Sequence, residues 1–106
     1  MRIEGFDWDA GNLTKCQKHG LSVPEIEALF HGIPAVYADP EHSLAEQQLR
    51  AIGRTADGRH VIVVFTLRQQ AGRVFVRPIS ARYMHAKEVS RYERRQTKEA
   101  TGPVDG

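Results

Sequence analysis

The sequence predicts an α+β domain, with a central antiparallel sheet of about four strands, two N-terminal helices and a C-terminal helix. Two observations support this prediction. Helix-capping patterns begin at Asp9 and at Ser22, near the start of the chain. Apolar segments with strand character then follow one another from about Ala35 to Ala81, separated by polar and glycine-containing turns.

Length and composition indicate one intracellular globular domain. The 106 residues are 41% hydrophobic and 26% charged, and no apolar run approaches the roughly 18 to 20 residues of a membrane helix. Residues 1–6 lack the apolar core of a secretory signal, and the single Cys16 fits a reducing compartment. We expect a cytoplasmic protein without a membrane partner, folded over residues 1–96, with a disordered tail over residues 97–106.

The first predicted helix follows a short strand or extended arm over residues 3–8, where apolar and polar residues alternate imperfectly. Asp9 can cap a helix from about residue 10 to residue 18. This helix ends at His19-Gly20, because glycine readily adopts the left-handed conformation that closes a helix.

The second predicted helix begins with a capping box. Ser22-Val23-Pro24-Glu25 places a serine hydroxyl and a glutamate three residues apart, which predicts a helix over about residues 23–31. Gly32 and Pro34 end it. Residues 35–38 can then form a short strand.

A first hairpin is predicted after a polar loop that begins at Asp39-Pro40. A strand over about residues 48–56 leads into Asp57-Gly58, a strong signal for a two-residue type I′ turn. A two-residue turn fixes the pairing of the strands. The predicted pairs are Arg54 with Val61, Ile52 with Val63 and Arg50 with Phe65.

A second hairpin joins strands over residues 60–68 and 73–81 through a four-residue turn over residues 69–72. In this register three arginines share one face of the sheet: Arg68, Arg73 and Arg77. The helix-packed core is assigned to the other face, with Val61, Val63, Phe65, Leu67, Val74 and Val76. A final helix over about residues 84–96 aligns His85, Glu88, Val89 and Tyr92 on one stripe.

The charge is distributed unevenly. The net charge is only +2, but most acidic residues lie in the first half, whereas the segment from Arg50 to Arg95 is rich in arginine. The strand that ends near Ala81 runs directly into cations, hydroxyls, His85 and Glu88. Guanidinium groups match phosphate oxygens, so the pattern favours an anionic partner such as nucleic acid.

Several kinds of chemistry have no support in the sequence. The five histidines and one cysteine show no zinc-binding spacing, and neither a Walker motif nor a G-x-G-x-x-G is present. Ser80 and Cys16 are conceivable nucleophiles but are more often structural in such positions. We therefore expect no metal and no cofactor.

Metal-independent acid–base chemistry on RNA remains, in which a ribose 2′-hydroxyl attacks the adjacent phosphate. The candidate proton carriers are Lys18, His19, Glu46, His85 and Glu88. The candidate phosphate-binding arginines are Arg50, Arg54, Arg68, Arg77 and Arg82, and the aromatic rings that could stack on bases are Trp8, Tyr83 and Tyr92. Each of these residues also has an ordinary structural or solvated interpretation.

Several short motifs resemble the BrnT toxin family of type II toxin–antitoxin systems over about residues 4–95. They are Phe6-Asp7-Trp8-Asp9, Lys18-His19-Gly20-Leu21-Ser22, Asp39-Pro40, Ile52-Gly53, the segment from Val63 to Arg68, and Ile79-Ser80-Ala81-Arg82. The resemblance implies a RelE-like fold and an endoribonuclease that blocks translation. It also implies a hetero-oligomer with a BrnA-type antitoxin, whose ribbon-helix-helix domain binds DNA, so that DNA is contacted only through the antitoxin.

The predicted catalytic residues are His19, Glu46, Arg68, Arg82 and His85. The predicted RNA-binding residues are Lys18, Arg50, Arg54, Arg77, Tyr83 and Tyr92. Gln48 departs from the family pattern, in which an arginine is common. This departure favours an alternative function, a catalytically inactive binding module that tunes the DNA binding of its antitoxin. A second alternative is a domain that binds nucleic acid directly, which the basic second half permits.

Overall fold

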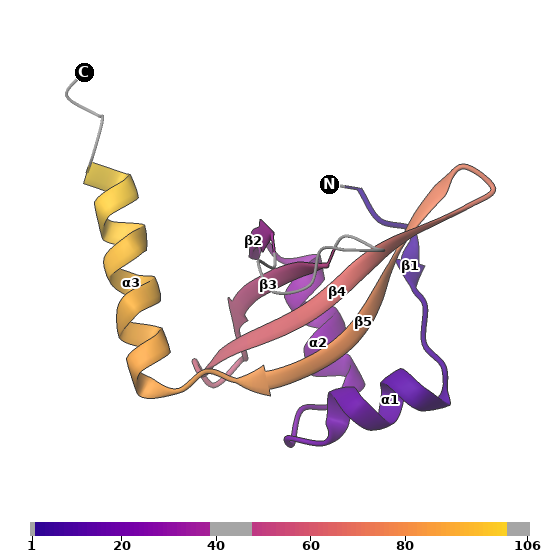
Figure 1. Cartoon of the computed structure of the whole chain (residues 1–106), viewed down its shortest axis with the longest axis horizontal. Coiled ribbons are helices and arrows are strands. Elements are labelled where there is room, and N and C mark those ends of the chain that lie inside the picture. The colour runs from indigo at the N-terminus through magenta and orange to yellow at the C-terminus, as the bar shows by residue number, and fades with distance from the viewer. Residues whose placement is uncertain (1, 39–47, 102–106) are drawn as a thin grey trace.

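The structure is a computed structural model that describes residues 2–38 and 48–101. Within these ranges the chain forms three helices and a five-stranded sheet with strand order β1-β5-β4-β3-β2 (Figure 1). The predicted α+β class is confirmed, with one strand more than expected. The predicted loop at Asp39-Pro40 and the candidate Glu46 lie outside the described residues.

Both N-terminal helices begin at the predicted caps. In α1 (Ala10–Gln17), Asp9 accepts a hydrogen bond from the Asn12 amide, and the Asn12 side chain accepts one from the Asp9 amide. The Asn12 side chain also donates to the Pro78 carbonyl oxygen at 2.9 Å, which ties α1 to the sheet. In α2 (Val23–His31), Ser22 and Glu25 form the predicted capping box.

The strands lie close to their predicted positions. β1 is only Gly5–Phe6 and pairs in parallel with β5, so the sheet is mixed rather than purely antiparallel. The other strands are β2 (Ala35–Ala38), β3 (Leu49–Arg54), β4 (His60–Gln70) and β5 (Arg73–Tyr83). The last helix, α3 (Ala86–Thr101), continues past the predicted end at Gln96. Of the expected tail, residues 102–106 lie outside the described residues.

The hydrophobic core fills the space between α1, α2 and one face of the sheet. Val61, Val63 and Phe65 of β4 are at most 2% exposed. They pack with Cys16 of α1, with Ile26 and Leu29 of α2, and with Leu21 between the two helices. This confirms the predicted core face, except that Leu67 is 38% exposed. Figure 1 shows α3 standing beyond the end of β5, away from α1 and α2.

The predicted register of the first hairpin is wrong by one residue. Arg54 pairs with His60, Ile52 with Ile62 and Arg50 with Val64. The loop has three residues rather than two, because the Gly58 amide donates to the Thr55 carbonyl oxygen and Gly58 then takes φ +88°. A turn followed by a left-handed glycine is the usual three-residue hairpin loop.

The second hairpin has a shorter loop than predicted. Gln70 pairs with Arg73, so only Ala71 and Gly72 form the turn, with φ +54° and +77°. Two consecutive positive φ angles are typical of a type I′ turn. The predicted four-residue loop is wrong, but the difference shifts the pairing by an even number of residues and leaves each side chain on its predicted face.

A β-bulge in β5 decides on which face of the sheet Arg82 lies. Val64 pairs with Ser80 and Phe65 with Pro78, so Ile79 is the extra residue. Side chains alternate between faces, and the extra residue brings Arg82 onto the same face as Arg73 and Arg77. All the arginines of the described strands therefore share the face opposite the core, which we call the basic face: Arg50, Arg54, Arg68, Arg73, Arg77 and Arg82.

The contact between α2 and β3 gives a first prediction. A Cβ atom added at Gly53 would lie 2.4 Å from Leu29 Cδ1 and 3.0 Å from Leu29 Cγ. Because Leu29 is buried, Gly53→Ala should lower the free energy of unfolding by about 1 to 3 kcal/mol, measured by urea denaturation. The double variant with Leu29→Ala should lose less free energy of unfolding than the sum of the losses in the two single variants. Strictly additive losses would contradict this contact.

Candidate functional site

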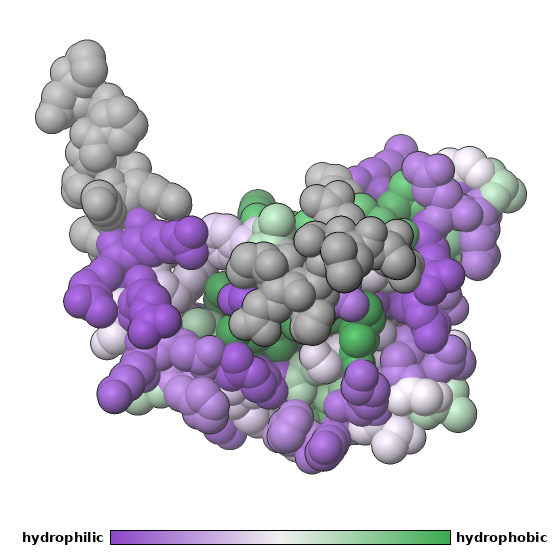
Figure 2. Space-filling model, viewed as in Figure 1, coloured by the Kyte–Doolittle hydropathy of each residue, from purple (hydrophilic) through white to green (hydrophobic). Residues whose placement is uncertain are grey.

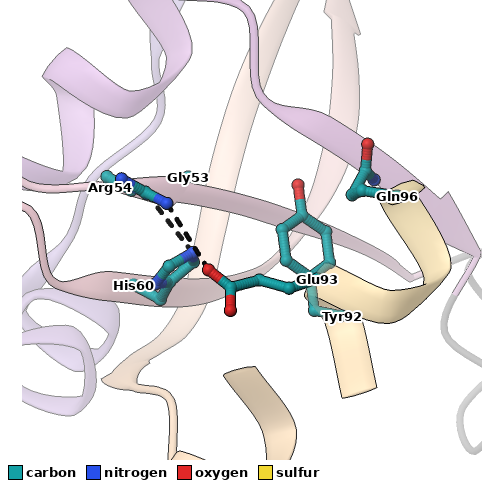
Figure 3. Close-up of a pocket in the computed structure, with 6 residues that line it drawn as sticks. All are labelled: Gly53, Arg54, His60, Tyr92, Glu93 and Gln96. Carbon is teal, nitrogen blue, oxygen red and sulfur yellow. Dashed lines mark hydrogen bonds and ion pairs between the residues drawn. The ribbon is translucent and has the colours of Figure 1, made fainter. Parts of the chain in front are cut away.

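A pocket of about 500 Å³ lies between the β3–β4 hairpin and α3 (Figure 3). The hairpin places Arg54 directly opposite His60, and Arg54 Nε donates a hydrogen bond to His60 Nε2 at 3.3 Å. In this contact His60 Nε2 is the acceptor, which uses the lone pair of that nitrogen. The corrected register creates this pair.

Helix α3 supplies the opposite wall of the pocket. Glu93 Oε2 lies 3.6 Å from Arg54 Nη2, and the Tyr92 ring meets the His60 ring edge-on at a centroid distance of 5.9 Å. Gln96 also lines the pocket and donates to the Tyr37 hydroxyl of β2 at 2.9 Å. The pocket thus brings a guanidinium, an imidazole, a carboxylate and an aromatic ring together (Figure 3).

A second, smaller cleft continues from this pocket under α3 and shares Tyr92 with it. Its basic lining comes from Arg50 of β3 and from Arg91 and Arg95 of α3, and its floor is the apolar pair Ile52 and Ile62. The Arg95 guanidinium also lies 5.0 Å from the centre of the Tyr37 ring. Cations from the sheet and from the helix therefore surround the same cleft.

Helix α3 is joined to the sheet by a bidentate ion pair. Arg82 Nη1 and Nη2 donate to Glu88 Oε1 and Oε2, both at 2.8 Å. Glu88 Oε1 also accepts from the His85 backbone amide at 2.9 Å, at the first turn of α3. The hydrogen bonds from Arg82, aided by the His85 amide, lower the pKa of Glu88 to about 2. Glu88 and Arg82 therefore stay charged and hold the start of α3 against β5.

Arg77, by contrast, is held at the other edge of the sheet. Its Nη2 lies 2.7 Å from Asp9 Oδ2, and its Nη1 lies 3.5 Å from Asp7 Oδ2. The Asn12 backbone amide, and next the Arg77 side chain, lower the pKa of Asp9. These contacts connect β5 to the start of α1, so Arg77 has an evident structural role.

Not all the predicted site residues come together. Arg50, Arg54, Arg82 and Tyr92 lie around the pocket and its adjoining cleft, and His85 lies exposed at the start of α3. Arg68 is eight residues along β4 from His60, about 26 Å at ~3.3 Å per residue. Glu46 lies outside the described residues.

Lys18 and His19 lie elsewhere, at the exposed corner between α1 and α2 on the core side of the sheet. A Cβ at the neighbouring Gly20 would come 3.9 Å from the Tyr83 ring. The Tyr83 ring also carries the Arg59 guanidinium, 3.5 Å from its centre. Tyr83 therefore already has a cation–π partner at this corner.

His60, Glu93 and Gln96 line the pocket, although the sequence pattern did not predict them as site residues. A three-residue loop, which the glycine at position 58 permits, would have placed His60 opposite Arg54. The conceivable nucleophile Cys16 is fully buried, and burial raises the pKa of its thiol to about 11. Among the described residues, no group of three histidine, cysteine or acidic side chains is placed to hold a metal ion.

Comparison with protein families places the chain among known toxins. Residues 8–88 match the family model described as the ribonuclease toxin BrnT of type II toxin–antitoxin systems. The chain belongs to the BrnT family. The match covers most of the chain, so the predicted resemblance is confirmed, and membership assigns a toxin role with an antitoxin as partner. No curated protein matches the sequence.

The matched segment includes both hairpin residues of the pocket, Arg54 and His60, and the Arg82–Glu88 ion pair. It ends before Tyr92, Glu93 and Gln96, so the helical wall of the pocket lies beyond the BrnT match. Among the described residues, no helix is both long and apolar enough to cross a membrane.

The Arg82–Glu88 pair gives a second prediction. Glu88→Gln should lower the free energy of unfolding by about 1 to 2 kcal/mol at pH 7, because it breaks a charge-assisted pair that solvent partly screens. The pKa of Glu88 is lowered from 4.5 to about 2 on folding, so the pair stabilises the fold fully above about pH 4.5. This stabilisation is lost as the pH falls toward 2.

The measurement is urea unfolding of the parent chain and Glu88→Gln at pH 7 and at pH 3. The difference between them should shrink at pH 3. Glu4→Gln is the control, since Glu4 pairs only at 3.9 Å with the exposed Arg2 and should change stability little. A Glu88→Gln effect that is the same at both pH values would contradict the assigned role.

Proposed function

We propose that this BrnT chain is a metal-independent endoribonuclease whose reaction takes place in the pocket between the β3–β4 hairpin and α3. The observation that carries the proposal is the contact of Arg54 with both His60 and Glu93, at 3.3 Å and 3.6 Å. One cation thus lies between an imidazole and a carboxylate, two kinds of side chain that commonly act as general acid or base. When a ribose 2′-hydroxyl attacks the adjacent phosphate, the reaction is aided by a base, an acid and a cation, and Glu93, His60 and Arg54 can supply them.

The reaction begins when the Arg54 guanidinium turns from His60 Nε2 to a phosphate of the RNA. His60 Nε2 is then free to take up a proton beside the bound anion. Glu93 accepts the proton of the 2′-hydroxyl, and the 2′-oxygen forms a bond to phosphorus. The bond from phosphorus to the 5′-oxygen breaks, and His60 gives its proton to that oxygen. The products are a 2′,3′-cyclic phosphate and a 5′-hydroxyl.

The neighbouring cleft supports binding of the substrate. Arg50, Arg91 and Arg95 line it and can neutralise phosphates on either side of the cut. The half-buried Tyr92 ring lies at the boundary between cleft and pocket, where a base could stack on it. Arg82 contributes mainly by holding α3 in place through Glu88.

The proposed antitoxin is of the BrnA type, with a ribbon-helix-helix domain, and forms a hetero-oligomer with the toxin in the cytoplasm. An acidic or amphipathic segment of that antitoxin would inhibit by covering the basic face and the cleft under α3. The charge of this surface supports the proposal, since Arg91 and Arg95 on α3 add to the sheet arginines. DNA is then contacted through the antitoxin rather than by this chain.

The third prediction tests the pocket. His60→Ala should lower kcat/KM for RNA cleavage roughly 10² to 10⁴-fold, because it removes the group that protonates the leaving oxygen. Cleavage of a labelled RNA by purified protein in EDTA measures this. His31→Ala, an exposed histidine of α2, is the control and should retain activity.

His19→Ala and His85→Ala complete the series. Full activity of His60→Ala together with loss of activity in His19→Ala or His85→Ala would move the catalytic site away from this pocket. If the folded parent chain binds its antitoxin but cleaves no RNA, the inactive binding module becomes the better account.

A further inference from the structure

The end of the β4–β5 hairpin projects from the rest of the sheet as a two-stranded arm, which we define as residues 67–74. β3 pairs with β4 only as far as Phe65, and β1 pairs with β5 only at Phe75 and Val76. Among the described strands, no further strand pairs with residues 67–74 on either side, and at the β5 edge the Glu4 amide donates to the Val74 carbonyl oxygen at 2.8 Å. Figure 1 shows this arm extending away from α1, α2 and α3.

The arm is basic, polar and exposed. No acidic residue occurs between Asp57 and Glu88, so β4 and β5 together carry no carboxylate. Arg68 and Arg73 are exposed, and both belong to the basic face. Gln69 and Gln70 add exposed amides, and Figure 2 shows hydrophilic surface over the arm as well as over α3.

The arm and the pocket lie on the same face of the sheet. The basic face runs from Arg54 and His60 at one end of the β3–β4 pairing to Arg68 and Arg73 at the tip. Its length along β4 is about 26 Å. At ~3.4 Å for each stacked nucleotide, this distance corresponds to about eight nucleotides.

We propose that the arm is a second binding site for the RNA substrate, which holds the phosphate backbone of the strand about eight nucleotides from the cut. This inference rests on the proposed function, since it assigns the substrate of the same site as a single strand long enough to span the basic face. Arg68 is then a binding residue at a distance and not a catalytic residue. The same arrangement makes long RNA a better substrate than short RNA.

The surface of the arm favours RNA over a protein partner. A protein interface normally centres on buried aromatic or large apolar anchors. Among the large apolar side chains of the arm, only Leu67 is markedly exposed, at 38%. Arginines and glutamines on a carboxylate-free ribbon instead match a chain of phosphates.

The test compares an RNA of 4 nucleotides with one of 20 nucleotides that contains the same cleavage site. Arg68→Ala/Arg73→Ala should raise KM for the 20-mer roughly tenfold, because two phosphate contacts are lost, with kcat unchanged. Cleavage of the 4-mer should stay within twofold. Lys15→Glu is the control, because it changes the net charge by the same two units on α1, outside the arm.

Binding of an uncleavable 20-mer with 2′-O-methyl riboses separates this inference from the nuclease proposal. Its affinity should fall roughly tenfold in the arm variant, and the slope of log K against log salt concentration should fall by about 1 to 2. If the 20-mer binds through the arm but the chain cleaves no RNA, the proposed nuclease activity is overturned while the arm remains an RNA-binding site. If the parent chain cleaves RNA but the arm variant binds the 20-mer as tightly as the parent, the arm is not an RNA site. The same holds if the arm variant weakens only the binding of the antitoxin.

Discussion

The extra residue at Ile79 is the constraint on which the arrangement of charge depends. Without this bulge, the alternation of side chains would place Arg82 on the core side of β5, among Val61, Val63 and Ala81. Burying a guanidinium there without an acidic partner would strongly destabilise the fold. The bulge moves Arg82 to the basic face, where it meets Glu88 and fixes the start of α3. The inserted residue therefore places Arg82, and with it the start of α3, on the face that already carries Arg54, Arg68 and Arg73.

Helix α3 both builds the pocket and competes for its cations. Glu88 accepts from Arg82, and Glu93 lies beside Arg54, so two carboxylates of the helix contact two arginines of the sheet. The Arg82–Glu88 pair is short and bidentate, whereas the Arg54–Glu93 pair is longer and more than half exposed. A phosphate can displace the weaker contact and leave the stronger one intact. The helix thus stays attached while Arg54 becomes available to RNA.

Local signals in the sequence predicted the helices, the strands and the core face well. Asp9 and Ser22 capped their helices as expected, because capping depends on neighbouring residues only. The register of the first hairpin depended on whether two or three residues form the loop at Gly58, and both are compatible with Asp57-Gly58. That one residue decided whether Arg54 faced a valine or His60, so the central pair of the pocket was missed. The contribution of Glu93 depended on the direction of α3, which follows from the Arg82–Glu88 contact rather than from the pattern within the helix.

The most direct test of this account is to locate bound RNA on the folded chain by NMR, using the uncleavable 2′-O-methyl 20-mer. The account predicts shifts in the side-chain Nε–Hε signals of Arg54 and Arg73 and in the backbone amides of α3, with α1 and α2 unaffected. Shifts confined to α1, α2 and the Lys18-His19 corner would contradict it, because they would place the substrate on the opposite side of the sheet.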